Sequence, residues 1–268
     1  MRFTKMHGIG NDFIVVNGFV EAEPQSFFTL ARAMCDRHYG IGADGLVWLS
    51  PSAEANARMR VFNTDGTEAE MCGNGLRCAA RSMLDQGIVD APEMTIETLA
   101  GVLRATITDD GIECDMGVPR VAPAEIPVAM PENRFSLEIG GRTLSFFCAS
   151  MGNPHAVTFD LYPDDKVFHW LGPLLEKHNV FPNGANIEFC RMTDDGIDVR
   201  VWERGDGPTL GCGTGACAVL TAAATMGLCG REARVNLPGG HLHIRWAKGG
   251  HMFMSGPAQA VFTGEYAG

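Results

Sequence analysis

The chain has 268 residues, of which 46% are hydrophobic and 20% charged, a composition typical of a soluble globular protein. Its formal net charge of −11 argues against nucleic acid or an anionic membrane as a partner, because both favour a basic patch. No apolar run approaches the roughly 18 residues of a membrane span, and the start of the chain does not resemble a signal peptide. Nine cysteines without a secretory signal favour a reducing cytoplasm over a disulfide framework.

The first half of the chain has the apolar patterning of short strands and two helices. Ser26 precedes apolar residues at helical spacing, which predicts a helix that it caps and that ends near residue 37. Apolar residues at i, i+3 and i+4 after Cys72 predict a second helix that stops at Gly87. The strands expected in this half are 2–5, 13–16, 46–49, 58–63, 94–98, 102–108 and 112–116.

The second half repeats this order after a proline-rich segment, 119–131, whose beginning we take as a domain boundary. A helix is expected around 167–178. The helix that follows Cys212 is apolar nearly all round and must be buried on every side, which indicates a helix wrapped by a curved sheet. The strands expected here are 137–139, 143–148, 156–159, 186–191, 197–202, 234–237, 242–246 and 251–254.

Two loops with the same pattern lie 140 positions apart. Cys72-Gly73 corresponds to Cys212-Gly213, and in each case an arginine lies 12 positions upstream. A repeat of this length has too few copies for a solenoid, so it indicates two similar halves that face each other and each contribute one cysteine. We predict an N-terminal domain (1–118, with the tail 258–268 packing back on it), a C-terminal domain (119–257) and an active site in the cleft between them.

Each of these two cysteines precedes glycines and a predicted helix start. The free N–H groups and partial positive charge of a helix start lower the pKa of a thiol there, which makes it a usable base or nucleophile. Burial as an inert small residue is the commonest role of a free cysteine. It is the simplest interpretation of Cys78 and Cys217 inside the helices, whereas the matched contexts of Cys72 and Cys212 favour catalytic thiols.

Two other cysteine chemistries fit the pattern less well. Structural zinc usually takes cysteine pairs two to four residues apart, with a matching second pair or histidines. The spacings from Cys72 to Cys78 and from Cys212 to Cys217 are wider, so no metal is predicted. A cysteine–histidine hydrolase could use His155, but it needs one nucleophile and leaves the second cysteine unexplained.

Two thiols on opposing faces of one cavity suit inversion at the α-carbon of an amino acid. One thiolate removes a proton from one face while one thiol returns a proton to the other, and two helix starts could stabilise the carbanion without a cofactor. His155 and Glu203 would be placed to share the proton that makes the thiols unequal. Arg204 could bind a carboxylate as a fork. Four loop asparagines, each of which also has an ordinary turn role, are further candidates: Asn11, Asn63, Asn153 and Asn186.

Six short motifs in this order resemble the diaminopimelate epimerase family over essentially the full length. Each motif is weak by itself, but the combination is specific. The motifs are His7-Gly8-Ile9-Gly10-Asn11-Asp12-Phe13, Asn63-Thr64-Asp65-Gly66, Cys72-Gly73-Asn74-Gly75, Gly152-Asn153-Pro154-His155, Glu203-Arg204-Gly205 and Cys212-Gly213-Thr214-Gly215.

The resemblance implies a cofactor-independent isomerase that interconverts LL- and meso-2,6-diaminopimelate in lysine and peptidoglycan synthesis, usually as a homodimer. It implies an α+β fold of two pseudo-symmetric domains, each a curved, barrel-like mixed β-sheet around a central helix. Cys72 and Cys212 would be the bases, and His155 and Glu203 would tune them. The implied substrate-binding residues are Asn11, Asn63, Gly73, Asn74, Asn153, Asn186, Glu203, Arg204, Gly213 and Thr214.

Several alternatives remain open at the level of sequence. Similar scaffolds racemise histidine, proline or hydroxyproline, although a proline racemase would have no use for a distal carboxylate clamp at Arg204. A non-catalytic amino-acid-binding protein would gain nothing from paired activated thiols, and a thiol redox protein would use Cys72 and Cys212 as a disulfide couple. One departure from the family is Gly45 after Asp44, where some members carry glutamine.

Overall fold

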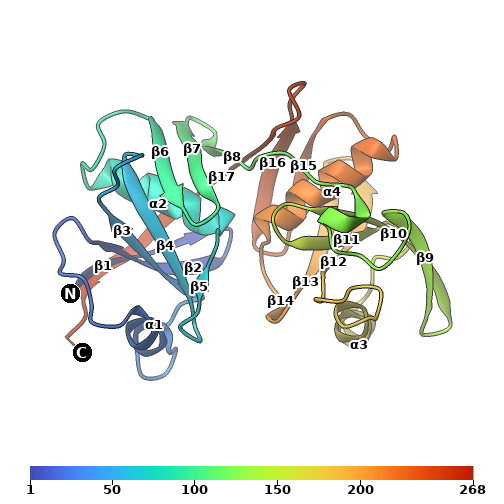
Figure 1. Ribbon diagram of the computed structural model, residues 1–268, viewed down its shortest axis with the longest axis horizontal. Coiled ribbons are helices and arrows are strands. Elements are labelled where there is room, and N and C mark those ends of the chain that lie inside the picture. Colours follow the sequence, from blue (N-terminus) through green and yellow to red (C-terminus); the bar gives the residue numbers. More distant parts are fainter. Residues whose placement is uncertain (268) are drawn as a thin grey trace. The chain divides into compact units, whose positions relative to one another are not determined.

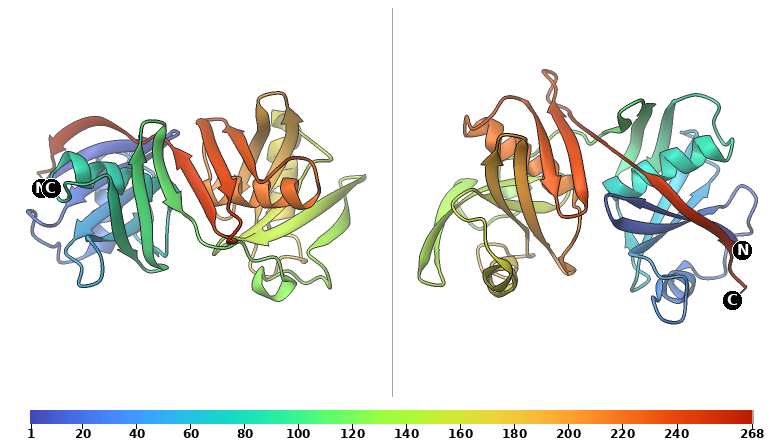
Figure 2. Two further views of the ribbon diagram at one scale, coloured as in Figure 1. Left: turned by 90° about the horizontal axis from the view of Figure 1, so that it is seen from above. Right: turned by 180° about the vertical axis from the view of Figure 1, so that it is seen from behind.

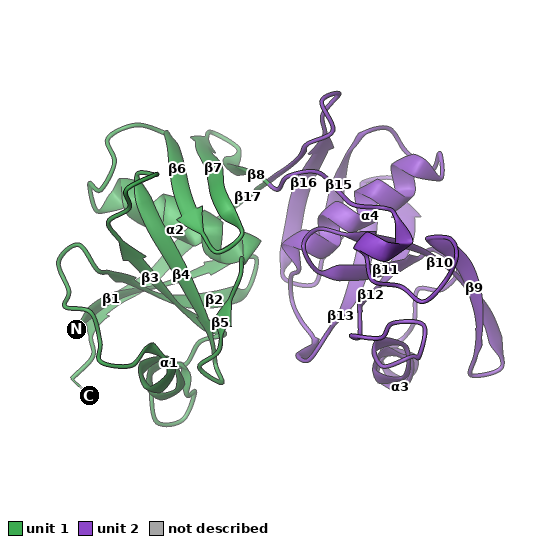
Figure 3. Cartoon of the chain, in the orientation of Figure 1, with its two compact units in different colours: residues 1–115, 255–268 green, residues 116–254 purple. Residues whose placement is uncertain are grey.

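The computed structural model describes residues 1–267 and divides into two compact units (Figure 3). Unit 1 comprises Met1–Asp115 and Ser255–Gly268, and unit 2 comprises Met116–Met254. The helices are α1 (Phe27–Cys35), α2 (Gly73–Asp85), α3 (Asp165–Glu176), α4 (Gly213–Thr225) and the short 3-10 helix η1 (Pro123–Glu125). No helix within residues 1–267 is long and apolar enough to cross a membrane.

Unit 1 is a mixed sheet with α2 against it (Figure 1). Its strands pair in the order β18–β1–β2–β3–β4–β6–β7–β8, and the β2–β3 and β4–β6 pairs are parallel. Figure 2 shows the C-terminal strand running alongside β1. The strands are β1 (Arg2–Gly8), β2 (Asn11–Asn17), β3 (Gly45–Ser50), β4 (Ala57–Asn63), β5 (Glu68–Ala69), β6 (Glu93–Thr98), β7 (Gly101–Thr108), β8 (Gly111–Asp115) and β18 (Gln259–Glu265).

Unit 2 repeats this arrangement around α4. Its strands pair in the order β9–β10–β11–β12–β13–β15–β16, and the parallel pairs are β11–β12 and β13–β15. The strands are β9 (Arg134–Ile139), β10 (Arg142–Ser150), β11 (Pro154–Thr158), β12 (Asn186–Thr193), β13 (Gly196–Glu203), β14 (Gly207–Pro208), β15 (Glu232–Leu237) and β16 (Gly240–Trp246); β17 (Met252–Gly256) spans the boundary between the units.

The registers of the two sheets identify equivalent positions. In unit 1, Val47 of β3 pairs with Val15 on one side and Val61 on the other. In unit 2, Glu188 of β12 pairs with Val157 and Val201 in the same way. Val47 and Glu188 are therefore equivalent, and so are Phe13 and His155, which lie two residues before Val15 and Val157. These equivalences allow the surroundings of the two cysteines to be compared residue by residue.

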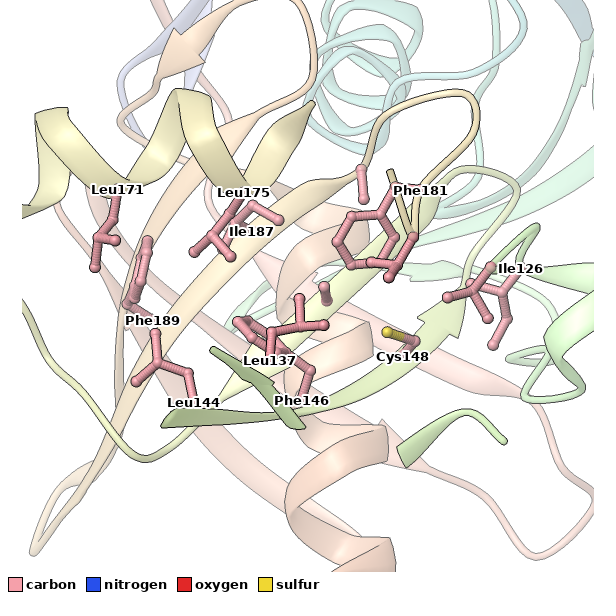
Figure 4. Close-up of a cluster of buried hydrophobic side chains, with 14 of the residues drawn as sticks. Ile126, Leu137, Leu144, Phe146, Cys148, Leu171, Leu175, Phe181, Ile187 and Phe189 are labelled. Atoms are coloured by element: carbon pink, nitrogen blue, oxygen red, sulfur yellow. The ribbon is translucent and has the colours of Figure 1, made fainter. Parts of the chain in front are cut away.

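In unit 2, helices pack on both faces of the sheet. Ten of the 13 residues of α4 are buried, as its apolar composition predicts. On the other side of the unit 2 sheet, α3 contributes Leu171 and Leu175 to a cluster with Ile187 and Phe189 of β12 (Figure 4). An amphipathic helix thus covers the outer face of the sheet and an almost wholly apolar helix lies against the inner face.

The α+β class with mixed sheets is confirmed, and both sheets are open. Some bounds and short strands differ from the sequence prediction. Helix α1 ends at Cys35 rather than near residue 37, because the Asp36 side chain accepts hydrogen bonds from the N–H groups of His38 and Tyr39 and forms a turn. The strand β18 and the two-residue strands β5 and β14 were not predicted, since their pairing depends on partners elsewhere in the chain.

Candidate active site

Cys72 and Cys212 are the N-cap residues of α2 and α4. Both have extended backbones, with φ of −141° and −117°, and each Sγ accepts a hydrogen bond at 3.4 Å from the N–H three residues later, at Gly75 and Gly215. The thiols thus take the capping position that serine, threonine or aspartate usually fills. The first-turn residues Gly73 and Gly213 keep N–H groups available at each helix start.

Around Cys72, unit 1 provides amide groups. The Sγ of Cys72 lies 4.0 Å from Asn11 Oδ1, which also accepts a hydrogen bond from Asn74 Nδ2 at 3.0 Å. The Oδ1 of Asn74 in turn accepts from the guanidinium of Arg77 at 2.7 Å, and Arg77 is fully buried. The structure therefore brings together three residues predicted for the site, Cys72, Asn11 and Asn74, and adds Arg77.

Asn11 is oriented by a charged network that the sequence did not indicate. Its Nδ2 donates to Asp44 Oδ2 at 2.8 Å, and Arg37 contacts both Asp44, at 2.7 Å, and Asp12, at 2.8 Å. Burial by itself raises the pKa of Asp12, but hydrogen bonds from Arg37 and Lys5 outweigh it and lower the pKa to about 2. Asp44 thus holds the Asn11 amide with its oxygen toward Cys72.

Two other positions of unit 1 lie at the ends of β3 and β4. Asn63 is exposed, and its Nδ2 donates to Thr67 Oγ1 at 3.1 Å in the turn after β4. Gly45 is confined, because a Cβ there would lie 2.9 Å from the carbonyl oxygen of Phe62 and 3.3 Å from the Phe13 ring. A side chain at position 45 would therefore require the backbone to shift.

Around Cys212, unit 2 provides carboxylates instead. Cys212 Sγ lies 3.4 Å from Thr214 Oγ1. Burial raises the pKa of Cys212 well above its ordinary value, and the carboxylates of Glu203 and Glu188 raise it further. The lowered pKa expected from the helix start is therefore wrong for this thiol, because desolvation and the negative neighbours outweigh the N–H groups. Cys212 rests as a neutral thiol.

Glu203 lies at the end of β13 and accepts a hydrogen bond from the hydroxyl of Thr209. Burial raises the pKa of Glu203, although hydrogen bonds from Thr209 and Cys212 and the charge of His155 act in the opposite direction. This carboxyl group is therefore held near the thiol with a reduced tendency to ionise, which suits a group that exchanges a proton.

His155 of β11 is fully buried between two oxygen atoms. Its Nδ1 lies 2.6 Å from Glu188 Oε1 and its Nε2 lies 2.9 Å from Asn153 Oδ1. Glu188 did not feature in the sequence prediction. The available signal was a lone charged residue within the apolar run of β12, Ile187-Glu188-Phe189-Cys190, because a charge is rarely buried without a partner.

Asn186 and Arg204 are linked through the backbone. Asn186 is buried; its Nδ2 donates to the Pro154 carbonyl at 2.9 Å, and its Oδ1 accepts from the Arg204 N–H at 2.8 Å. The guanidinium of Arg204 is exposed and donates to the Asn183 carbonyl at 3.3 Å. Asn186 therefore fixes the backbone that carries Arg204 and joins it to the start of β11, next to His155.

Each of the two helices capped by these thiols carries a second cysteine. Cys78 and Cys217 are fully buried inside α2 and α4, and burial raises the pKa of Cys78 to about 12. None of the nine cysteines forms a disulfide. Within residues 1–267, no three histidine, cysteine or acidic side chains are grouped so that they could hold a metal ion.

Comparison with known proteins places this site in a family. The sequence model of the family described as diaminopimelate epimerase matches residues 3–122 and 147–261. The chain is 50% identical to a diaminopimelate epimerase of Desulforudis audaxviator and 48% identical to one of Pelotomaculum thermopropionicum, in both cases over 99% of each chain. A probable proline racemase from Agrobacterium radiobacter shares the fold, with a TM-score of 0.73 and 16% identity over 99% of this chain and 92% of that one. The two cysteine loops thus stand within a full-length match, and the chain belongs to the diaminopimelate epimerase family, as the order of its motifs predicted.

Proposed function

We propose that this chain interconverts LL- and meso-2,6-diaminopimelate, with Cys72 and Cys212 as the two groups that exchange protons with the α-carbon. The observation that carries the proposal is the matched position of the two thiols, each the N-cap of a helix and each bonded to the third N–H of that helix. The activity is that of an isomerase, and it serves the synthesis of lysine and peptidoglycan precursors.

The reaction proceeds by transfer of two protons. In one direction the thiolate of Cys72 removes the α-proton while the thiol of Cys212 donates a proton to the opposite face, and the roles exchange in the other direction. The N–H groups at Gly73, Asn74, Gly213 and Thr214 bind the α-carboxylate and stabilise the negative charge that develops beside it. All of these groups belong to the protein, so the proposal requires no cofactor.

The neighbours of Cys212 support its role as the resting acid. Because burial and two carboxylates raise the pKa of Cys212, this thiol keeps its proton until it donates that proton to the α-carbon. Glu203 lies next to it, with His155 close to Glu203, and these two groups receive or return a proton when the roles exchange. Asn11 contacts both Cys72 and Asn74, and it keeps the second thiol in position.

The rest of the substrate is held by polar side chains at loop ends. Arg204 is exposed on a backbone fixed by Asn186, and it binds the distal carboxylate as a fork. Asn63 and Asn153 complete the contacts to the distal amino and carboxylate groups. We also propose a cytoplasmic location and a homodimer, and sedimentation velocity of the purified chain tests the dimer.

Exchange of the α-proton with solvent deuterium tests the reaction directly. Reduced protein is incubated with LL-diaminopimelate in deuterium oxide, and the α-protons are followed by NMR. The wild type is expected to produce the meso isomer with deuterium at the inverted carbon, while Cys72→Ala and Cys212→Ala lose this conversion. The matched controls are Cys78→Ala and Cys217→Ala, which remove the buried cysteine of each helix and are expected to retain it.

Other outcomes would separate the alternatives. Exchange of proline or histidine with diaminopimelate left intact would keep the two-thiol reaction and show that the proposed substrate is wrong. An absence of exchange with every amino acid would show that the thiols are not α-carbon bases. In that case a redox role would be tested by titrating the two thiols against glutathione.

A further inference from the structure

β11 and β12 place a buried pair of ionisable groups beside the start of α4. His155 and Glu188 are both fully buried, and Glu188 Oε1 lies 2.6 Å from His155 Nδ1. The same oxygen packs against the first turn of α4, because a Cβ on Gly215 would lie 2.8 Å from it and 3.3 Å from Cys212 Sγ. The other oxygen, Oε2, has no hydrogen-bond partner among the described residues.

The surroundings of the imidazole ring favour its doubly protonated form. Both ring nitrogens face oxygen atoms, Glu188 Oε1 at 2.6 Å and Asn153 Oδ1 at 2.9 Å. A neutral imidazole carries a proton on one nitrogen and can donate to only one of these acceptors, whereas an imidazolium donates to both. The positive ring also gives the buried carboxylate the partner that its burial requires.

Unit 1 shows that the fold does not require this pair. At the positions equivalent to His155 and Glu188 it carries Phe13 and Val47, whose exposed fractions are 3% and 0%. Val47 Cγ2 would lie 3.6 Å from a Cβ on Gly75, so it fills the space that Glu188 fills beside Gly215. Apolar side chains therefore suffice for packing, and the ionisable pair serves a purpose specific to the Cys212 side.

We propose that Glu188 is a positioning residue that keeps His155 positively charged beside Cys212. The inference rests on the proposed function, in which Cys212 must become a thiolate in one direction of the reaction. That thiolate would lie close to the carboxyl groups of Glu203 and Glu188. The charge on His155 offsets these negative groups. It is available only if the Glu188 carboxylate accepts a hydrogen bond from the second ring N–H and so keeps that proton on the ring.

The other titratable groups near Glu188 do not supply this charge. Cys148 of β10 and Cys190 of β12 lie close enough for Glu188 to affect them, but burial raises the pKa of both thiols far above the ordinary value. They stay neutral. Glu203 of β13 and Cys212 at the start of α4 carry negative charge or none. Among these side chains, His155 is therefore the one whose chemistry allows a positive charge.

Two substitutions of Glu188 test the proposal through activity. Glu188→Gln removes the charge and retains the size, and Glu188→Val copies the equivalent residue of unit 1 in case the amide disturbs folding. Both are expected to lower kcat by about 10- to 100-fold, the range known for loss of the carboxylate partner of a metal-binding histidine, with little change in KM. The control is Asp198→Asn, which removes a carboxylate of β13 that forms an ion pair with Arg191 of β12. This variant is expected to leave kcat unchanged.

The charge on His155 is measured without substrate. The nitrogen-15 NMR signals of the histidine side chains are recorded at neutral pH, and the His155 signal is assigned by its loss in His155→Gln. We expect both ring nitrogens to be protonated in the wild type and one to lose its proton in Glu188→Gln and Glu188→Val. Because this spectrum needs no turnover, it is informative even if diaminopimelate is not the substrate.

Three results would overturn the proposal. A neutral His155 ring in the wild type would show that Glu188 does not hold it charged. A ring that stays doubly protonated in both Glu188 variants would show that another group does so. Loss of the second proton with unchanged kcat would show that the charge has no role in the reaction.

Discussion

The starts of α2 and α4 have the same backbone and different electrostatic surroundings. In both, a cysteine caps the helix and bonds the third N–H. Around Cys72 lie the amides of Asn11 and Asn74, with the buried Arg77 behind them. Around Cys212 lie two carboxyl groups and a histidine. The repeat thus duplicates the geometry of the thiol but not its charge.

This difference matches what a two-base reaction needs. Two thiols in identical surroundings would compete for one proton, and the state with one thiolate and one thiol would not have a preferred arrangement. Carboxylates lie around one thiol and a guanidinium lies behind the amides at the other, so in the proposed reaction the two thiols are expected to differ in their hold on the proton. The predictions below test this comparison, beginning with the largest expected effect.

Replacing either capping thiol by a hydroxyl should produce the largest loss. Cys72→Ser and Cys212→Ser keep the cap but substitute a group that is far harder to ionise, so kcat should fall by about 10²- to 10⁴-fold, the usual contribution of a general acid or base. Steady-state assays of both variants measure this loss, with circular dichroism to check the fold. A variant that retained wild-type kcat would show that the cysteine it replaces is not a base or an acid of the reaction.

The glycines one turn into each helix should respond differently to alanine. In Gly215→Ala the new Cβ would lie 2.8 Å from Glu188 Oε1, so the carboxylate must move; we expect a stability loss of about 1–3 kcal/mol and reduced activity. In Gly75→Ala the nearest atoms are 3.5 Å or more away, and removing a helical glycine should stabilise by up to about 1 kcal/mol. Urea unfolding of both variants measures the difference. Equal effects would contradict the closer packing of Glu188 against Gly215.

Acid titration should identify Asp12 as a stabilising carboxylate of unit 1. Its pKa is lowered to about 2 in the folded protein, so it contributes stability above its ordinary pKa that is lost as the pH falls toward 2. The contribution at neutral pH is about 2 kcal/mol. The stability difference between the wild type and Asp12→Asn should therefore shrink between pH 4 and pH 2 in urea titrations. A difference that does not depend on pH would contradict the ionised state of Asp12.

Glu203 should show the opposite dependence in unit 2. Burial raises its pKa in the folded protein, so its stabilising contribution is present below the ordinary carboxyl pKa and is lost as the pH rises through the raised value. Glu203→Gln cannot ionise, so its stability relative to the wild type should increase as the pH rises over this range. Unfolding curves at several pH values measure this smallest effect. If the stability of Glu203→Gln relative to the wild type fell as the pH rose, the pKa of Glu203 would be lowered by folding rather than raised.

Much of the fold could be predicted from the sequence, because its signals are local. The helices after Cys72 and Cys212 follow from glycine, a capping side chain and apolar spacing within a few residues, and the burial of α4 follows from its composition. The strand β18 could not be predicted, because it depends on pairing with β1 at the other end of the chain. For the same reason, the network of Asp44 and Arg37 that orients Asn11 escaped prediction.

The sequence by itself determined the family, the two thiols and the helix starts that hold them. Each motif is a short run of residues, and its backbone conformation depends on glycines and capping side chains within that run. Only the tertiary structure decided the charges around those thiols. Glu188 reaches His155 because β11 and β12 pair in parallel across a separation of 33 residues. Burial then determines the consequence, since desolvation reverses the pKa shift that the start of α4 alone would cause in Cys212.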